Sequence, residues 1–302
     1  MYFCNIITRS RLYQFIALYN SIKENSKSYK IFVLCMDEDT FRILEEAKLD
    51  NLILNKLIEI EDNHLLSLKS IRKAEEYCWT LKPVYLMYLL GRNNIDRLTY
   101  IDADLFFYDD PERILEKSNN CSVLLSEHDC NSDIKYVEED VGRFNAGIVS
   151  FKNNFRGRNC LNWWKQQCIK WCYNTTETGQ FGDQKYLEEM PERFNDVRPI
   201  DVAGVNIAPW NDEKYKICIK KGKLFINEDR LILYHYCGFR VIDKNSCVFM
   251  YGNKYFPPIH NPYMESIKNA ILLVESIDRE FDGSFIEKCN EGRFNIYSLT
   301  VR

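Results

Sequence analysis

Apolar residues in the first third of the chain follow two different spacings. Short continuous apolar runs predict buried strands, and stretches with apolar residues three or four positions apart predict helices. The expected order is strand 2–7, helix 11–23, strand 31–36 and helix 38–48. Such alternation is typical of parallel strands joined by right-handed crossovers, so the sequence predicts an α/β fold.

The same pattern continues, less regularly, toward the C-terminus. A helical stretch around 84–90 comes before strand 98–101, an apolar run at 105–108 and a helix starting at Asp110-Pro111. Further strands (122–126, 144–151), helices (157–173, 184–189) and short β-rich segments (205–208, 215–219, 223–226, 231–236) follow. Together these segments predict a mixed, mostly parallel central sheet.

The last apolar pattern is a helix expected at 262–281. Ile267, Ile271, Val274 and Phe281 recur at helical spacing, and the intervening positions carry Lys, Glu and Asp. This helix is expected to pack on the core. We therefore predict one main domain over residues 1–260 and a C-terminal helical extension over 261–302 that packs on it.

Composition narrows the class of protein. The chain has 302 residues, 46% of them hydrophobic, which is enough for a large core. A net charge of −4 gives no electrostatic reason to bind nucleic acid. No apolar run reaches the roughly 18 residues that span a bilayer, and the first residues resemble a buried strand rather than a leader. We expect a cytoplasmic protein with free thiols, without a transmembrane segment; peripheral membrane contact stays open.

The candidate chemistry begins at Asp102 and Asp104, directly after strand 98–101. Side chains two residues apart on a strand leave on the same side, so the two carboxylates converge. Converging carboxylates repel each other unless a cation lies between them, and their oxygen atoms suit Mg²⁺ or Mn²⁺. A metal ion held there can bind a diphosphate. The alternative for an isolated Asp-x-Asp is a solvated turn.

Four segments together resemble the motifs of metal-dependent GT-A glycosyltransferases, most closely glycosyltransferase family 8. They are Asp102-Ala103-Asp104, Phe144-Asn145-Ala146-Gly147-Ile148, Phe181-Gly182-Asp183-Gln184 and His235-Tyr236-Cys237-Gly238. Similar bacterial surface-polysaccharide enzymes also show a Lys-Pro like Lys82-Pro83 and a motif like 206–211. The resemblance runs from Tyr2 to about Arg240, and implies that residues 1–260 form a GT-A catalytic domain.

The resemblance implies a ligand set and a donor site. Mn²⁺ or Mg²⁺ is expected on Asp102, Asp104 and His235, where it holds the diphosphate of a nucleotide sugar. A lone histidine would by default be structural. The residues expected at the donor and its metal are Thr8, Lys82, Asp102, Ala103, Asp104, Asn145, Gly238 and Arg240. The family's closing Lys-Pro-Trp is missing, and Arg240 or Lys244 is expected to supply its charge.

The resemblance also implies catalytic positions at Asn145, Asp183 and Gln184. Two of them have a simpler alternative: Asn145 as a turn residue, and Asp183 as an acid at a helix N-terminus, where the helix dipole favours it. The alternative for Lys82 is a solvated lysine at a helix start. The alternative for Thr8 is a residue that caps the following helix.

The implied activity is that of a hexosyltransferase-type glycosyltransferase. It would move a sugar from a UDP-sugar to a glycan or lipid-linked acceptor, with retention of configuration. An inverting route would need a carboxylate base. A sugar-nucleotidyltransferase and a non-catalytic binding module of the same fold remain alternatives. Tyr255, Phe256 and Tyr263 are candidates for an acceptor cleft.

Overall fold

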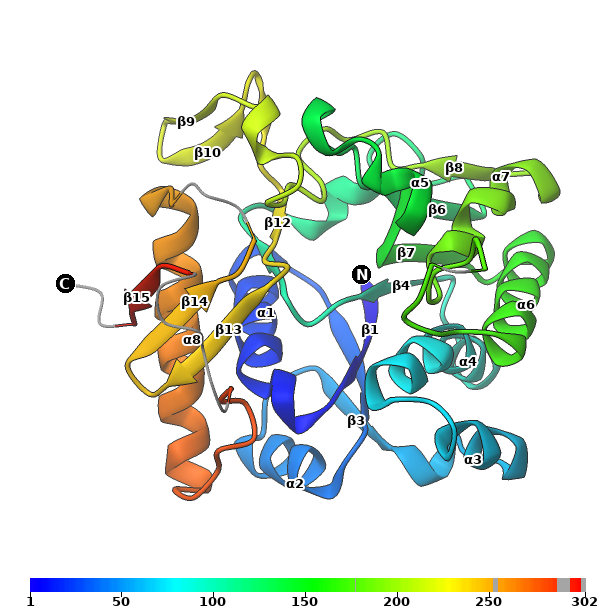
Figure 1. Ribbon diagram of the computed structural model, residues 1–302, viewed down its shortest axis with the longest axis horizontal. Helices are drawn as coiled ribbons and strands as arrows, with labels where there is room; N and C mark the ends of the chain where they lie inside the picture. The colour runs from blue at the N-terminus through cyan, green and yellow to red at the C-terminus, as the bar shows by residue number, and fades with distance from the viewer. Residues whose placement is uncertain (177, 252–254, 287–293, 300–302) are drawn as a thin grey trace.

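The computed structural model describes residues 1–176, 178–251, 255–286 and 294–299. Its centre is a seven-stranded sheet in the order β3-β2-β1-β4-β7-β6-β8 (Figure 1). The strands are β1 (Tyr2–Ile7), β2 (Lys30–Cys35), β3 (Leu52–Lys56), β4 (Arg97–Ile101), β6 (Val123–Glu127), β7 (Phe144–Lys152) and β8 (Val197–Pro199). All are parallel except β7, which runs antiparallel to β4 and β6. The predicted mixed, mostly parallel sheet is confirmed.

Helices cover both faces of this sheet, which explains why its strands are continuous apolar runs. One face packs against α1 (Leu12–Asn25), α2 (Glu38–Ala47) and α8 (Pro257–Ile277). The other face packs against α3 (Asn63–Lys69), α4 (Ala74–Arg92) and α6 (Phe155–Lys170). Residues of β1 alternate between the two cores: Phe3 and Ile7 belong to the first, and Cys4 and Ile6 to the second.

Smaller elements surround the carboxyl end of the sheet. A two-stranded ladder joins β5 (Leu105–Phe107) to β12 (Leu233–His235) in antiparallel register. Two three-stranded sheets flank it. They are formed by β9 (Ile217–Lys220), β10 (Lys223–Ile226) and β11 (Asp229–Arg230), and by β13 (Phe239–Asp243), β14 (Ser246–Phe249) and β15 (Ile296–Ser298). Two short helices, α5 (Val137–Val141) and α7 (Met190–Arg193), complete the set.

Several predicted boundaries were wrong. Helix α4 has 19 residues and includes Pro83, whereas the prediction began the helix after Pro83, because proline is disfavoured inside a helix. The helices expected at Asp110 and at 184–189 are 3₁₀ helices, Pro111–Leu115 and Lys185–Glu189. Segment 205–208 is not a strand and makes only a single bridge, from Ile207 to Tyr234. The C-terminal helix begins at Pro257, because prolines are tolerated in a first helical turn.

Helix α8 shares its core with the rest of the fold, so the predicted C-terminal helix is confirmed. It packs along α1 and α2. Ile267 and Ile271 are fully buried, and the Tyr263 ring stacks on Tyr236 with 3.7 Å between centroids. None of the described helices combines the length and the apolar character needed to cross a bilayer.

Candidate metal and donor site

The acidic pair lies in the turn between β4 and β5, at the carboxyl end of the central sheet. Strand β12 pairs with β5 so that His235 lies opposite Leu105, next to the turn. Backbone bonds fix both acids: Asp102 N donates to Gly147 O (2.9 Å), and Tyr236 N donates to Asp104 O (2.7 Å). One ligand atom from each of Asp102, Asp104 and His235 lies within 4.8 Å of the others. The three predicted metal ligands are therefore brought together.

A neighbouring asparagine fixes the state of the His235 ring. Nδ1 of His235 lies 3.1 Å from Oδ1 of Asn206, while Nδ2 of Asn206 donates to Glu127 O (2.9 Å). Because an amide oxygen only accepts, Nδ1 must carry the hydrogen. Nε2, which lies 3.2 Å from Oδ1 of Asp104, is therefore the ring nitrogen that a metal ion can bind. This is the arrangement in which a histidine binds a metal ion through Nε2.

Two arginines face Asp104. Burial would raise the pKa of Asp104, but His235, Arg11 and Arg240 together hold it well below its usual range. Burial lowers the pKa of Arg240, and the like charge of Arg11 lowers it further. The charge of Arg240 thus acts on Asp104, and its role at the diphosphate stays a prediction. Arg11 was missed, although the two basic residues that follow the first strand, Arg9 and Arg11, were a usable signal.

Lys82 lies inside α4 and is buried, so it is not a solvated lysine at a helix start. Its Nζ is 3.2 Å from Oδ1 of Asp102 and 3.3 Å from Oδ2 of Asp183, and it donates to Ala146 O (3.2 Å). Burial raises the pKa of Asp183 to about 6, although the Lys82 ammonium opposes the rise. Asp183 is 3% exposed and lies two residues before the 3₁₀ helix Lys185–Glu189, so the alternative of an acid near a helix N-terminus stays open. Lys82 therefore links the metal-ligand turn to Asp183.

Asn145 is held by hydrogen bonds from both ends of its amide. Its Oδ1 accepts from Gly147 N (3.0 Å), and its Nδ2 lies 3.3 Å from Nε2 of His128. His128 Nδ1 in turn lies 2.8 Å from Gly142 O, a carbonyl that only accepts. Burial lowers the pKa of His128 to about 4, which keeps this ring neutral. His128 was not predicted as a site residue.

The remaining predicted positions are arranged around this centre. Gln184 Nε2 donates to Val141 O (2.9 Å). The Thr8 hydroxyl lies 2.8 Å from the Ser10 hydroxyl and makes no capping bond to the backbone. Ala103 is buried in the turn between the two acids. Gly238 has a φ of 80°, and a Cβ there would meet the ring of Tyr251 at 2.4 Å.

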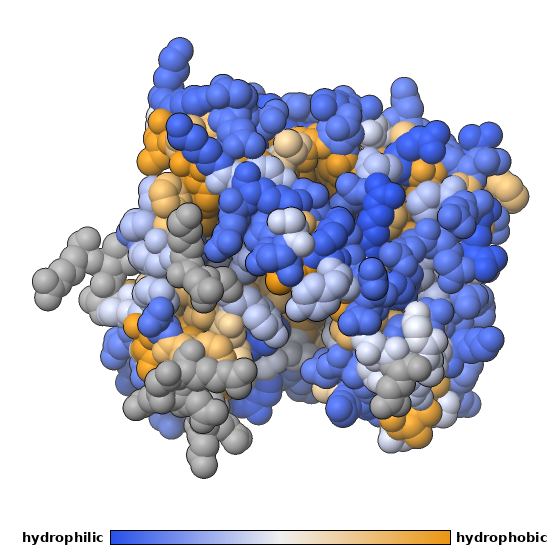
Figure 2. Space-filling model, turned by 45° about the horizontal axis from the view of Figure 1, so that its top comes forward, coloured by the Kyte–Doolittle hydropathy of each residue, from blue (hydrophilic) through white to orange (hydrophobic). Residues whose placement is uncertain are grey.

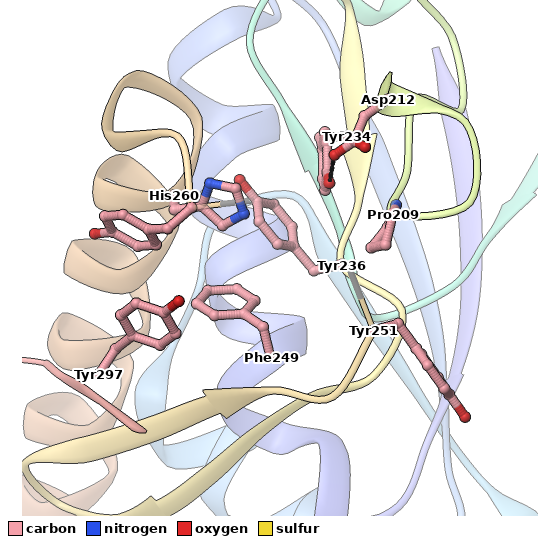
Figure 3. A pocket seen from close by; sticks show the side chains of 9 residues that line it. Pro209, Asp212, Tyr234, Tyr236, Phe249, Tyr251, His260 and Tyr297 are labelled. Atoms are coloured by element: carbon pink, nitrogen blue, oxygen red, sulfur yellow. Dashed lines mark hydrogen bonds between the residues drawn. The ribbon is translucent and has the colours of Figure 1, made fainter. Parts of the chain in front are cut away.

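An aromatic pocket opens on the far side of β12 from His235. Tyr234 and Tyr236 flank His235 in sequence, so their side chains leave the opposite face of the strand. Figure 3 shows them with Asp212 and Pro209 on one side, and His260, Phe249 and Tyr297 on the other. Tyr255 also lines this pocket, whereas Phe256 and Tyr263 do not.

Two proteins of Bacillus subtilis (strain 168) are similar to nearly the whole chain. Uncharacterized protein YfnF is 38% identical over 291 residues, covering 93% of this chain and 96% of YfnF. Uncharacterized protein YfnD is 32% identical over 295 residues, covering 95% of each chain. The chain belongs to the family of YfnF and YfnD. No protein-family model matches it.

The chain is also similar in fold to solved structures of glycosyltransferases. The galactosyltransferase LgtC, in complex with donor and acceptor sugar analogs, has a TM-score of 0.54 at 11% identity, covering 91% of this chain and 96% of LgtC. Glycosyltransferase GlyE of Streptococcus pneumoniae TIGR4 has a TM-score of 0.53 at 13% identity, covering 93% of this chain and 64% of GlyE. At such identities the likeness shows the fold alone, and confirms the predicted GT-A-like architecture.

Proposed function

We propose that the protein transfers a sugar from a nucleotide sugar to a glycan or lipid-linked acceptor. One observation carries the proposal. At the carboxyl end of β4, ligand atoms of Asp102, Asp104 and His235 converge within 4.8 Å. Ligands of open α/β sheets bind beyond the carboxyl ends of the strands, and this chain shares its fold with glycosyltransferases.

The residues fit a divalent cation. Two carboxylates and one imidazole suit Mn²⁺ or Mg²⁺, and Asn206 already holds His235 with Nε2 available. When bound, the cation supplies Lewis acidity that offsets negative charge on the departing diphosphate. Arg11 and Arg240 add positive charge near Asp104. They would replace the lysine of the Lys-Pro-Trp motif, which this chain lacks.

The remaining site residues are assigned to the reacting sugar. Asn145 lies between the metal-ligand turn and His128, with its amide fixed in one orientation, so it can position the donor sugar. Asp183 would stabilise positive charge that develops at the sugar or act as nucleophile, and Lys82 favours its ionised form. The motifs of this chain resemble those of retaining family 8 enzymes, so we assign a UDP-sugar donor and retention of configuration, with the diphosphate accepting the acceptor's proton.

Two other functions predict different outcomes. A non-catalytic module would bind the nucleotide sugar without releasing the nucleotide. A sugar-nucleotidyltransferase ordinarily has a glycine-rich phosphate loop after the first strand, whereas here Thr8 is followed by Arg9, Ser10 and Arg11. The release of a nucleoside diphosphate on addition of an acceptor distinguishes glycosyl transfer from both.

The first test replaces Asp104 by asparagine, which keeps its shape and removes its charge. Nucleotide sugars are screened with Mn²⁺ by thermal shift, because a ligand of the native state stabilises it. Turnover is then followed as released nucleoside diphosphate. We expect Asp104→Asn to lose Mn²⁺-dependent stabilisation and turnover.

The matched control is Asp133→Asn, because Asp133 is exposed on a 3₁₀ helix outside the site. This variant should behave as the unchanged protein does. Full turnover in EDTA, or in Asp104→Asn, would contradict the proposed function.

A further inference from the structure

A basic hairpin projects from the molecule beside the strand that carries His235. Strands β9 and β10 meet at Lys221-Gly222, both with positive φ (50° and 73°), as in a tight hairpin turn. The hairpin tip, defined here as residues 219–224, contains three lysines and no acid. Figure 1 shows it at the upper left of the molecule. The whole chain carries a net charge of −4, so this positive tip is a local feature.

The fold does not explain the placing of these charges. Lys220 and Lys223 lie directly opposite each other in the β9–β10 register, and like charges at such positions destabilise a hairpin. Lys220 pairs with Glu228 (2.8 Å), which is itself 91% exposed. Lys221 and Lys223 form no ion pair with any residue that the structure describes. Among the described residues, the exposed Lys221 and Lys223 therefore have no acidic partner, whereas Lys220 is held by Glu228 and lies over the Phe225 ring (5.1 Å).

The apolar face of the hairpin extends beyond the core to the same tip. Ile217 and Ile226 are opposite each other, and Ile226 is buried at 1% exposure. Ile219 and Leu224 form the next pair on that face, and Ile219 is 57% exposed. Figure 2 shows hydrophobic side chains beside hydrophilic ones on this upper left part of the molecule.

We infer that the hairpin tip docks the protein on an anionic lipid bilayer. Lysines near such a surface are attracted to its negative headgroups, and an exposed apolar side chain among them enters the boundary of the acyl region. A soluble polyanion would bind the lysines but would gain nothing from Ile219. The hairpin continues through β11 into β12, so a docked bilayer lies beside the strand that carries His235.

The test is co-sedimentation with two kinds of vesicle, one of phosphatidylglycerol and phosphatidylethanolamine, the other of phosphatidylcholine alone. The full chain should bind only the anionic vesicles, and less at high salt. Each lysine near the surface contributes roughly fivefold in partitioning, so replacing Lys220, Lys221 and Lys223 by Gln together should weaken binding about a hundredfold. Ile219→Ser should weaken binding while leaving its dependence on salt unchanged.

The matched control replaces Lys27, Lys30 and Lys170, which are exposed elsewhere, by Gln. It should bind like the unchanged protein, and no variant should melt at a markedly lower temperature than the unchanged protein. Vesicle binding needs no donor, so it can be scored even if the proposed activity fails. Equal sedimentation of the tip variant and the unchanged protein would overturn the inference. The inference would also be overturned if the protein bound long-chain polyphosphate more tightly than vesicles and if Ile219→Ser left the polyphosphate binding unchanged.

Discussion

Gly147 shows how closely the site residues approach one another. A Cβ at this position would lie 2.6 Å from Oδ1 of Asn145, 2.8 Å from Cε1 of His235 and 3.1 Å from Oδ2 of Asp102. The glycine is required here for space, because these contacts are shorter than side-chain atoms tolerate. Three predicted site residues, from the turn between β4 and β5, from β7 and from β12, therefore meet around the Cα atom of Gly147.

We expect Gly147→Ala to weaken Mn²⁺ binding by at least about tenfold, as loss of a group that orients metal ligands does. The added methyl group must push His235 or Asn145 away from its present position. Isothermal titration with Mn²⁺ measures the change.

Gly91→Ala is the control for this substitution. Gly91 lies in α4, and a Cβ there would meet only the far end of the Arg158 side chain at 3.7 Å. Alanine there should leave Mn²⁺ affinity unchanged and add roughly 0.5–1 kcal/mol to stability through helix propensity. Unaltered Mn²⁺ affinity in Gly147→Ala would show that the three side chains are not constrained as described.

At the scale of elements, α8 is joined to the core of the central sheet through α1. Its buried residues recur at helical spacing and belong to the same core as β1 and β2. Tyr236, next to His235, stacks on Tyr263 of α8. The C-terminal helix thus supports the strand that carries the proposed histidine ligand.

Neighbouring residues of α8 give a direct test of this packing. Ile271 is fully buried and Leu272 is 51% exposed. Ile271→Ala should cost about 2–5 kcal/mol, because it removes buried methyl groups and leaves a cavity. Leu272→Ala should change stability by less than about 0.5 kcal/mol. Urea unfolding of both variants measures the difference, and similar costs would contradict the packing of α8 on α1.

For the whole molecule, stability at acid pH depends on buried groups that titrate differently after unfolding. Burial lowers the pKa of His128 from 6.5 to about 4, so between these values only the unfolded chain takes up this proton. The free energy of unfolding therefore falls as the pH falls through this range. The raised pKa of Asp183, about 6, acts in the opposite direction, because there the folded chain binds the proton more tightly.

Replacing His128 by Gln isolates its contribution, since Asp183 is present in both proteins. The unchanged protein should lose about 3 kcal/mol more stability than His128→Gln between pH 7 and pH 4. Urea unfolding across this pH range provides the measurement. Parallel stability curves for the two proteins would mean that His128 is not held neutral by burial.

The sequence by itself determined the α/β class, the acidic turn after an apolar strand and the C-terminal helix. These three features follow from the local spacing of apolar residues, because that spacing indicates whether a strand or helix is buried on one side or on both sides. It also indicated His235 as a partner of Asp102 and Asp104, but only through its resemblance to known motifs. Where local signals were weak, as at Pro83 in α4, the predicted boundaries were wrong.

Only the tertiary structure decided how the site is held. The ion pairs of Lys82 with Asp102 and Asp183, the bond that fixes the His235 ring on Asn206 and the approach of Arg11 all join segments far apart in the chain. Local periodicity carries no information about such pairs, because their energies depend on distance and burial after folding. The sequence thus specified the elements, and their packing specified which charges meet.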